Sequence, residues 1–286
     1  MAVVSQPDRP RGRGRAFSPS PVAARALAAG VALLRPERVS DPAVEAGLRT
    51  LDPDIGVVVA FGQFLPRRIR ELPRLGYLVN AHASLLPKLR GAAPIARAIL
   101  EGEHETGISV MRVEREMDAG PVAAVERTPI AADEDAGALE SRLAGLAARA
   151  ISEALDRIAD RTITWTPQPA GQTTFAPKLE RDEARLDFHE PAEALVRRIR
   201  AFAPRPGAFT TFRGEPLRIL AASVEAGSCE ARPGTIRMVH STGGFRIATG
   251  SGWLVPRIVQ RAGGRPLAVA EFVRGARIDD GALLPG

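Results

Sequence analysis

Cysteine is almost absent from this chain of 286 residues, where Cys229 is the single example. One thiol cannot form an internal disulfide, and it offers no cluster with the spacing of a metal site. No apolar run approaches the roughly 18 residues that a membrane-spanning helix needs. The chain also opens without a secretory pattern, because Met1 to Val4 run directly into a polar segment. These absences predict a cytoplasmic protein that needs neither a metal nor a membrane.

Lysine is also scarce, since Lys88 and Lys178 are the only two and arginine carries most of the basic charge behind the net +6. Heavy arginine use with little lysine is typical of a GC-rich genome, which explains the total charge as well as a basic binding surface does. Four arginines nevertheless fall within residues 9–15, separated by proline and glycine: Arg9, Arg11, Arg13 and Arg15. Proline and glycine disfavour regular structure, so we expect an exposed basic loop suited to phosphates. Composition alone slightly favours a solvated basic tail over a nucleic-acid contact.

Apolar runs and helical patterns alternate through the first 160 residues. Residues 54–60 are almost wholly apolar, which is typical of a buried parallel strand, and residues 135–160 form a long amphipathic pattern. Such alternation predicts a sheet covered by helices, with ligands beyond the carboxyl ends of its strands. We expect helices at 21–29, 41–51, 66–71, 94–101, 135–160 and 190–202, and strands at 32–34, 54–60, 76–82, 108–113 and 121–127.

The hydrophobic pattern of the sequence changes after residue 206. Short alternating strands with glycine-rich turns are expected at 208–212, 217–220, 234–238, 245–248 and 253–255. Several short strands of this kind suggest a small barrel. We therefore expect a first domain at 1–177, a linker with a helix at 178–205, and a β-barrel at 206–286.

Asn80 and His82 end an apolar run and would point to the same face of a strand. Both side chains can donate a hydrogen bond, and His82 can carry charge near neutral pH. This combination suits the stabilisation of an oxyanion during acyl transfer. Taken alone, however, an Asn-x-His pair is more often a polar strand end that turns into a loop.

The residues that follow extend the pair into a longer pattern. It consists of Asn80-x-His82, Ser84-Leu85-Leu86-Pro87, Arg90-Gly91-x-x-Pro94-Ile95, Thr106-Gly107-Ile108-Ser109 and Asp118-x-Gly120-Pro121. The pattern resembles the signature of the formyltransferase family that uses 10-formyltetrahydrofolate. The resemblance implies an α/β, doubly wound, Rossmann-like catalytic domain, a small β-barrel of the oligonucleotide-binding type, a folate co-substrate and no metal.

The resemblance also implies roles for particular residues. Asn80 and His82 would donate to the formyl oxygen, while Asp118 would keep His82 charged and accept the proton that the attacking amine loses. The folate would lie along Phe61, Gly62 and Leu65, the Glu114 to Asp118 loop, and Ser84, Leu85, Leu86 and Pro87. For Phe61, Phe64 and Leu65, which belong to the Phe61 to Pro66 segment along which the folate would lie, simple core packing is an equal alternative.

Flanking sequence separates members of the family by substrate. Residues 6–22 are similar to the insertion loop of members that formylate methionyl-tRNA, and residues 178–187 and 199–206 are similar to their interdomain linker. The resemblance thus implies that Arg11, Arg13 and Arg15 contact initiator tRNA, with Arg13 first, in a monomeric enzyme of translation initiation. Formyl transfer to a small amine, such as an amino-sugar nucleotide or glycinamide ribonucleotide, and an inactive RNA-binding remnant stay open as alternatives.

One departure from the family pattern concerns the N-terminus. Family members begin with a strand, a Gly-Thr-Pro-x-Phe turn and a helix, whereas this sequence opens inside what resembles the second strand. The first strand of a doubly wound sheet is central, so about thirty residues of central structure would be missing. We expect the strand at 54–60 to have an unpaired edge, and the chain as written to be poorly soluble or inactive.

Overall fold

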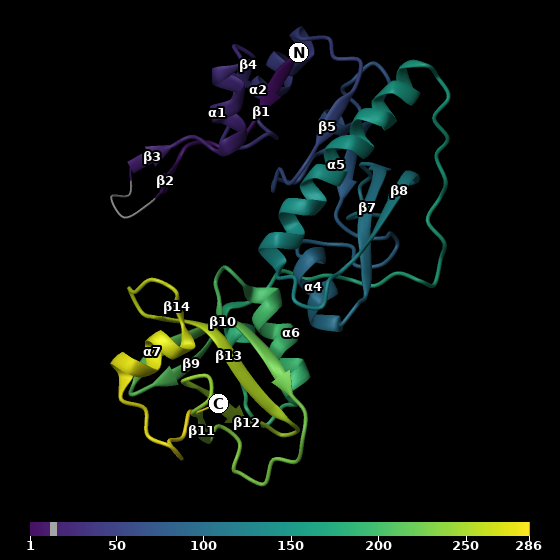
Figure 1. The fold of residues 1–286 in the computed structure, drawn as a ribbon. Helices are drawn as coiled ribbons and strands as arrows, with labels where there is room; N and C mark the ends of the chain where they lie inside the picture. Colours follow the sequence, from purple (N-terminus) through teal and green to yellow (C-terminus); the bar gives the residue numbers. More distant parts are fainter. Residues whose placement is uncertain (12–15, 286) are drawn as a thin grey trace. The chain divides into compact units, whose positions relative to one another are not determined.

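The computed structural model describes residues 1–11 and 16–285 (Figure 1). The chain forms two compact units, each made of several segments. The first unit comprises Met1–His82, Ser109–Val125 and Arg149–Gly171, and the second comprises Ala83–Ile108, Glu126–Ala148 and Gln172–Gly286. No helix in the described part of the chain is long and apolar enough to cross a membrane.

The first unit begins with two small sheets and two helices. Strand β1 (Ala2–Val4) pairs in parallel with β4 (Ala32–Leu34), and β2 (Arg9–Arg11) forms an antiparallel hairpin with β3 (Ala16–Ser18). Helices α1 (Pro21–Ala28) and α2 (Pro42–Thr50) both start at a proline, after the capping side chains of Ser20 and Asp41.

The prediction that the basic segment has no regular structure is therefore wrong at its ends. Pro10 lies opposite Phe17 in the β2–β3 hairpin. A two-stranded ribbon consists of edge strands, where a missing proline N–H need not interrupt a ladder. Arg13 and Arg15 lie outside the described residues, as does the side chain of Arg11.

A four-stranded sheet carries the residues of the acyl-transfer pattern. Its order is β5 (Gly56–Val58), β6 (Leu78–His82), β7 (Glu105–Arg112) and β8 (Val122–Pro129). Strand β5 runs parallel to β6, whereas β7 runs antiparallel to β6, so the sheet is mixed rather than purely parallel. The register places Asn80 opposite Met111 and His82 opposite Ser109.

The strand expected at 54–60 is shorter and more exposed than predicted. It spans three residues, and Val57 and Val59 keep 43% and 56% of their surface exposed. Among the described residues β5 pairs with β6 alone, so one of its edges has no neighbouring strand. The apolar composition of residues 54–60 predicted a buried strand, but burial of a strand also requires a neighbouring strand on its second edge.

Helices lie where the hydrophobic periodicity predicted them, to within a few residues. They are α3 (Arg67–Arg70), α4 (Pro94–Glu101), α5 (Ala136–Ala159) and α6 (Ala192–Phe202), with a 3-10 turn η1 (Arg181–Ala184). Helix α4 ends at Gly102, whose left-handed φ of 76° is favourable for glycine. Helix α6 packs against β10 (Glu215–Glu225) in the second unit (Figure 1).

The C-terminal part is an antiparallel sheet with the order β11-β12-β13-β10-β9, and β14 pairs with β13. The strands are β9 (Ala208–Phe212), β11 (Ile236–Val239), β12 (Gly244–Ala248), β13 (Trp253–Arg261) and β14 (Leu267–Ala268), followed by helix α7 (Val269–Ala276), which we did not predict. The chain end contacts both outer strands: Ile236 N donates to Ala282 O at 2.8 Å, and Thr210 Oγ1 donates to Pro285 O at 2.7 Å.

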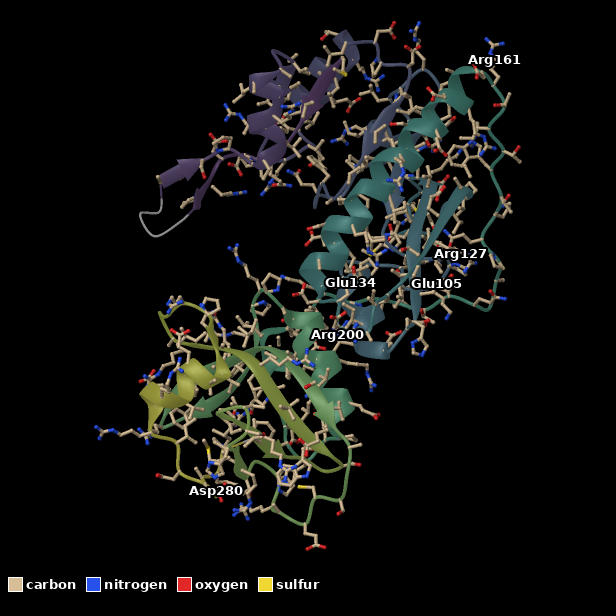
Figure 2. The ribbon with its side chains drawn as sticks, in the orientation of Figure 1. Glu105, Arg127, Glu134, Arg161, Arg200 and Asp280 are labelled. Atoms are coloured by element: carbon tan, nitrogen blue, oxygen red, sulfur yellow. The ribbon has the colours of Figure 1, made fainter. Side chains whose placement is uncertain are left out.

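Charged side chains fix several loops of the second unit (Figure 2). Glu105 of β7 and Arg127 of β8 form an ion pair at 2.6 Å. Arg200 of α6 donates to the carbonyl of Glu134 at 2.8 Å, and the Glu134 carboxylate accepts two bonds from Arg142 at 2.9 and 2.8 Å. The bonds from Arg142 hold the pKa of Glu134 below its ordinary value.

Candidate active site

Strand β6 positions the two residues of the Asn-x-His pair. Leu78 and Val79 are buried and anchor the strand, and His82 at its end is also buried. Asn80 is partly exposed, and its side-chain amide forms no hydrogen bond with the part of the chain that the structure describes. Because positions i and i+2 share a face of a strand, the amide and the imidazole point to the same side.

Asp118 lies beside His82. Its Oδ2 atom is 3.6 Å from Nδ1 of His82, and the side chains are 16% and 7% exposed. This separation is longer than a hydrogen bond, and it places the carboxylate beside the imidazole where both side chains are largely shielded from solvent. The structure therefore brings together the imidazole and the carboxylate that the sequence pattern singled out.

The turn that carries Asp118 has a backbone conformation that few residue types can adopt. Asp118 has a left-handed φ of 51°, which aspartate tolerates better than most residues. A Cβ atom at Gly120 would overlap the carbonyl oxygen of Arg112, so only glycine fits there. The Gln168 side-chain amide donates to the carbonyls of Asp118 and Gly120, both at 2.8 Å. No sequence motif predicted a role for Gln168, whose only local signal is its place between Pro167 and Pro169.

The loop after β5, which we predicted to hold folate, is fixed through its backbone. Gln6 Nε2 donates to the carbonyl of Phe61 at 2.6 Å, and Arg70 Nε donates to that of Leu65 at 3.1 Å. Phe61 and Leu65 are partly buried, whereas Phe64 is 73% exposed. Gly62 adopts a left-handed φ of 75°, which lets the loop turn tightly.

Ser84 to Pro87 belong to the second unit. The buried Ser84 hydroxyl donates to the carbonyl of Lys88 at 2.6 Å, and Lys88 N donates to Leu85 O at 3.1 Å. A Cβ at Gly107 would overlap the carbonyl oxygen of Glu126 and crowd the Leu85 side chain. The Ser84 hydroxyl thus holds the shape of its own loop, and Gly107 leaves room for Leu85.

Ion pairs hold the base of the β2–β3 hairpin, which together with the arginines between its strands in the sequence is here called the basic hairpin. Arg35 binds both carboxylate oxygens of Asp8 at 2.8 Å, and Arg9 lies 3.3 Å from Glu37. Part of the charge of Arg9 is therefore already compensated within the chain. Phe17 on β3 is 74% exposed beside these charges.

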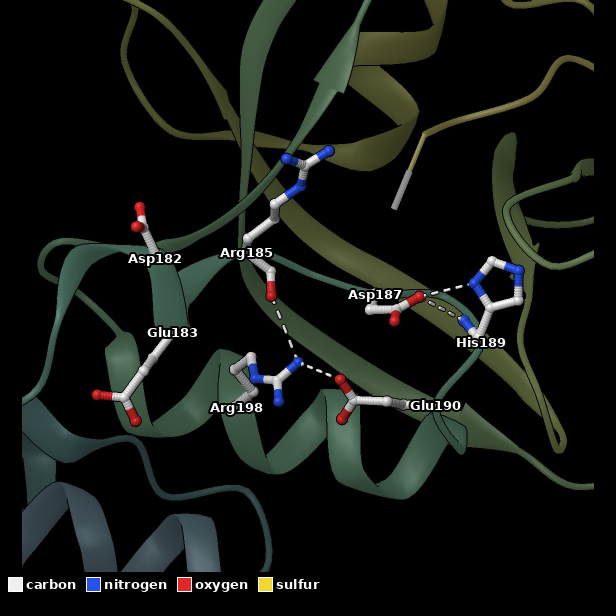
Figure 3. Close-up of a pocket in the computed structure, with 7 residues that line it drawn as sticks. All are labelled: Asp182, Glu183, Arg185, Asp187, His189, Glu190 and Arg198. Carbon is white, nitrogen blue, oxygen red and sulfur yellow. Dashed lines mark hydrogen bonds and ion pairs between the residues drawn. The ribbon is translucent and has the colours of Figure 1, made fainter.

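A pocket of about 550 Å³ in the second unit has charged walls (Figure 3). Asp187 accepts hydrogen bonds from the backbone and the ring of His189, and the backbone bond is the main cause of its lowered pKa. Arg198 donates to Glu190 at 2.7 Å and to the carbonyl of Arg185 at 3.3 Å. Because these groups bind one another, we assign the pocket a structural role at the start of α6.

Comparison with known proteins identifies the family. Residues 1–155 match the model of the formyl transferase family, and residues 178–277 match that of the formyl transferase C-terminal domain. The chain therefore belongs to the formyl transferase family. Its architecture is the α/β domain and the separate C-terminal domain of that family.

Individual relatives agree with this assignment. Methionyl-tRNA formyltransferase of Halorhodospira halophila is 46% identical over 286 residues, covering all of this chain and 90% of the relative. The enzyme of the same name from Roseiflexus castenholzii is 44% identical, covering all of this chain and 91% of the relative. Among solved structures, HypX from Aquifex aeolicus in complex with tetrahydrofolic acid has a TM-score of 0.61 at 19% identity, covering 82% of this chain and 41% of HypX, which shows similarity of fold.

Proposed function

We propose that this chain transfers a formyl group from 10-formyltetrahydrofolate to the α-amine of initiator methionyl-tRNA, for translation initiation. The observation that carries the proposal is identity of 44–46%, over the whole chain, to relatives named methionyl-tRNA formyltransferase. The buried His82 beside Asp118 supplies chemistry suited to this reaction.

The reaction replaces one carbon–nitrogen bond by another. The amine lone pair attacks the formyl carbon, negative charge develops on the formyl oxygen, and the bond to N10 of the folate then breaks. Asn80 and His82 would donate hydrogen bonds to that oxygen, and such donors commonly contribute several kcal/mol in the transition state. Asp118 would keep His82 charged and accept the proton that the amine loses, directly or through water, while N10 leaves protonated.

Backbone groups of two loops in the first unit would bind the folate. The first loop carries Phe61, Gly62 and Leu65, and its conformation is maintained by Gln6 and Arg70. The second runs from Glu114 to Asp118. Ser84, Leu85, Leu86 and Pro87 would supply the remaining contacts. This reaction needs no metal, since both the electrophile and the proton acceptor are already provided.

The tRNA would contact the basic hairpin and the C-terminal domain. Arg11, the last residue of β2, and Arg13 and Arg15, which follow it in the sequence, add three positive charges to which phosphates of the acceptor end would bind. Residues 206–286 would form a barrel of the oligonucleotide-binding type, which is supported by the bonds from the chain end to β11 and β9. We divide the chain into a catalytic domain at 1–177, a linker at 178–205 and this barrel, in a cytoplasmic monomer.

Purified protein tests this function directly. With 10-formyltetrahydrofolate and charged initiator tRNA, we expect formyl-methionyl-tRNA and tetrahydrofolate in equal amounts. Elongator methionyl-tRNA and an amino-sugar nucleotide serve as competing acceptors. Formylation of the sugar nucleotide in preference to initiator tRNA would contradict the proposal, and so would folate binding without transfer to any acceptor.

A further inference from the structure

The segment Trp165–Gln168, here called the strap, lies along the sheet of the first unit next to the turn of Asp118. Val122 N donates to Thr166 O at 2.8 Å and Thr166 N donates to Val122 O at 2.9 Å, so the strap pairs with the first residue of β8. Reciprocal bonds of this kind set the register of the strap against the sheet.

Aromatic packing fixes the start of the strap. The guanidinium of Arg112 lies over the Tyr77 ring at 4.1 Å and over the Trp165 ring at 4.7 Å, and the two rings meet edge to face at 5.6 Å. The Nε atom of Arg112 and Nε1 of Trp165 are buried without a hydrogen-bond partner within the described residues. Cation–π and ring packing therefore hold Trp165 in place.

The end of the strap supports the turn of Asp118. One amide nitrogen of Gln168 donates to the carbonyls on either side of Ala119, at 2.8 Å each. Left-handed backbone at a residue other than glycine costs about 1 kcal/mol or more, so the surrounding structure must maintain it. The two bonds from Gln168 oppose relaxation of the turn, and relaxation would rotate the Asp118 side chain relative to His82.

We propose that Gln168 is a positioning residue that sets the Asp118 carboxylate against His82 for proton transfer. This inference rests on the proposed formyl transfer and adds to it a residue outside the sequence pattern. Gln168 acts through the backbone of the turn, and the strap supplies the rigid base from which it acts. Its loss should lower the rate of the chemical step and leave tRNA binding intact.

The test compares Gln168→Ala and Gln168→Glu with the wild-type chain. The first variant removes both hydrogen bonds. The second keeps the shape of the side chain but places a carboxylate, which cannot donate a hydrogen bond, against the two carbonyl oxygens. Misplacement of a catalytic group by about 1 Å can cost about a hundredfold in rate, so we expect kcat to fall at least about tenfold for both variants. KM for charged tRNA should change by less than about twofold, since the proposed tRNA contacts lie in the basic hairpin and the C-terminal domain and not in this turn. Thr50→Ala is the matched control, because Thr50 Oγ1 also donates to a carbonyl, that of Gly47 at 2.7 Å.

A double-mutant cycle distinguishes a role of Gln168 in positioning Asp118 from a general contribution of Gln168 to the structure. If Gln168 acts through Asp118, Gln168→Ala should cost little further rate in an Asp118→Asn background. Additive losses would overturn the inference. So would a kcat above half of wild type in Gln168→Ala, or loss of folding by both Gln168 variants at the assay temperature. A wild-type chain that transfers no formyl group would instead refute the proposed function.

Discussion

Asp118 faces Nδ1 of His82 at 3.6 Å, with both side chains largely shielded from water. Shielding matters because salt and solvent weaken exposed charge pairs far more than buried ones. His82 ends a strand whereas Asp118 sits in a strained turn, so the geometry depends on that turn.

Removal of the site's side chains should affect catalysis far more than binding. Asn80→Ala, His82→Ala and Asp118→Ala should each lower formyl transfer by orders of magnitude, because these groups act on charge that develops in the transition state. Binding of tRNA should hardly change. Steady-state kinetics and filter binding measure the two effects, with the exposed His240 as control in His240→Ala. If His82→Ala kept more than about a tenth of the rate, its assigned role would be wrong.

The turn can be tested through a pair of glycines. Gly120→Ala should lower both the melting temperature and the activity, because the new Cβ would overlap the carbonyl oxygen of Arg112. Gly145→Ala in α5 meets nothing within 4 Å, so it should raise stability by about 0.5–1 kcal/mol through helix propensity. Thermal unfolding measures both changes. Equal stability of the two variants would show that the turn can shift without cost.

The sequence predicted most elements because their signals are local. Capping residues and prolines mark the starts of α1 and α2, and Gly102 marks the end of α4. The Asn-x-His pair also predicted His82 as a site residue, and the resemblance to the family predicted Asp118. Helix α7 was not predicted because it is only eight residues long and begins after Ala268, which offers no capping side chain.

Other features depend on contacts that no local pattern encodes. The burial of β5 depends on its neighbouring strands, and the direction of β7 depends on how the chain returns after α4. Gln168 reaches the Asp118 turn from a segment beyond α5, so its role follows only from tertiary structure. In the β2–β3 hairpin Pro10 is paired with Phe17, although proline usually indicates a turn or loop rather than a strand.

The ionic support around Glu134 should give the second unit a defined acid response. Its pKa is lowered mainly by hydrogen bonds from Arg142, so the charged carboxylate stabilises the fold above the ordinary carboxyl range, and this contribution is lost as pH falls through the lowered pKa. Glu134→Gln should destabilise the neutral-pH protein by about 1–3 kcal/mol. The difference from wild type should shrink below about pH 4. Denaturant unfolding across pH measures this, and Glu140→Gln, at an exposed position of α5, is the control. A constant difference at all pH values would exclude the ionic explanation.

The basic hairpin should determine how the chain uses tRNA. Arg9 is excluded from the test because Glu37 already lies 3.3 Å from it. Replacing Arg11, Arg13 and Arg15 together by alanine should raise KM for charged tRNA strongly, since each side chain that meets a phosphate releases counterions. The slope of log affinity against log salt should become shallower by about 2–3 if all three contact phosphates. Folate affinity and the melting temperature should stay near wild type.

A matched triple variant controls for net charge in this experiment. Arg149, Arg157 and Arg161 are exposed on or just after α5, and their replacement by alanine removes the same charge from another surface. If attraction to RNA depended only on total charge, both triple variants would lose tRNA affinity equally. Loss of tRNA affinity in the hairpin variant alone would assign the tRNA contact to the hairpin. A loss of folate affinity as large as the loss in tRNA use would instead place the hairpin at the folate, because phosphate contacts have no reason to act on that ligand.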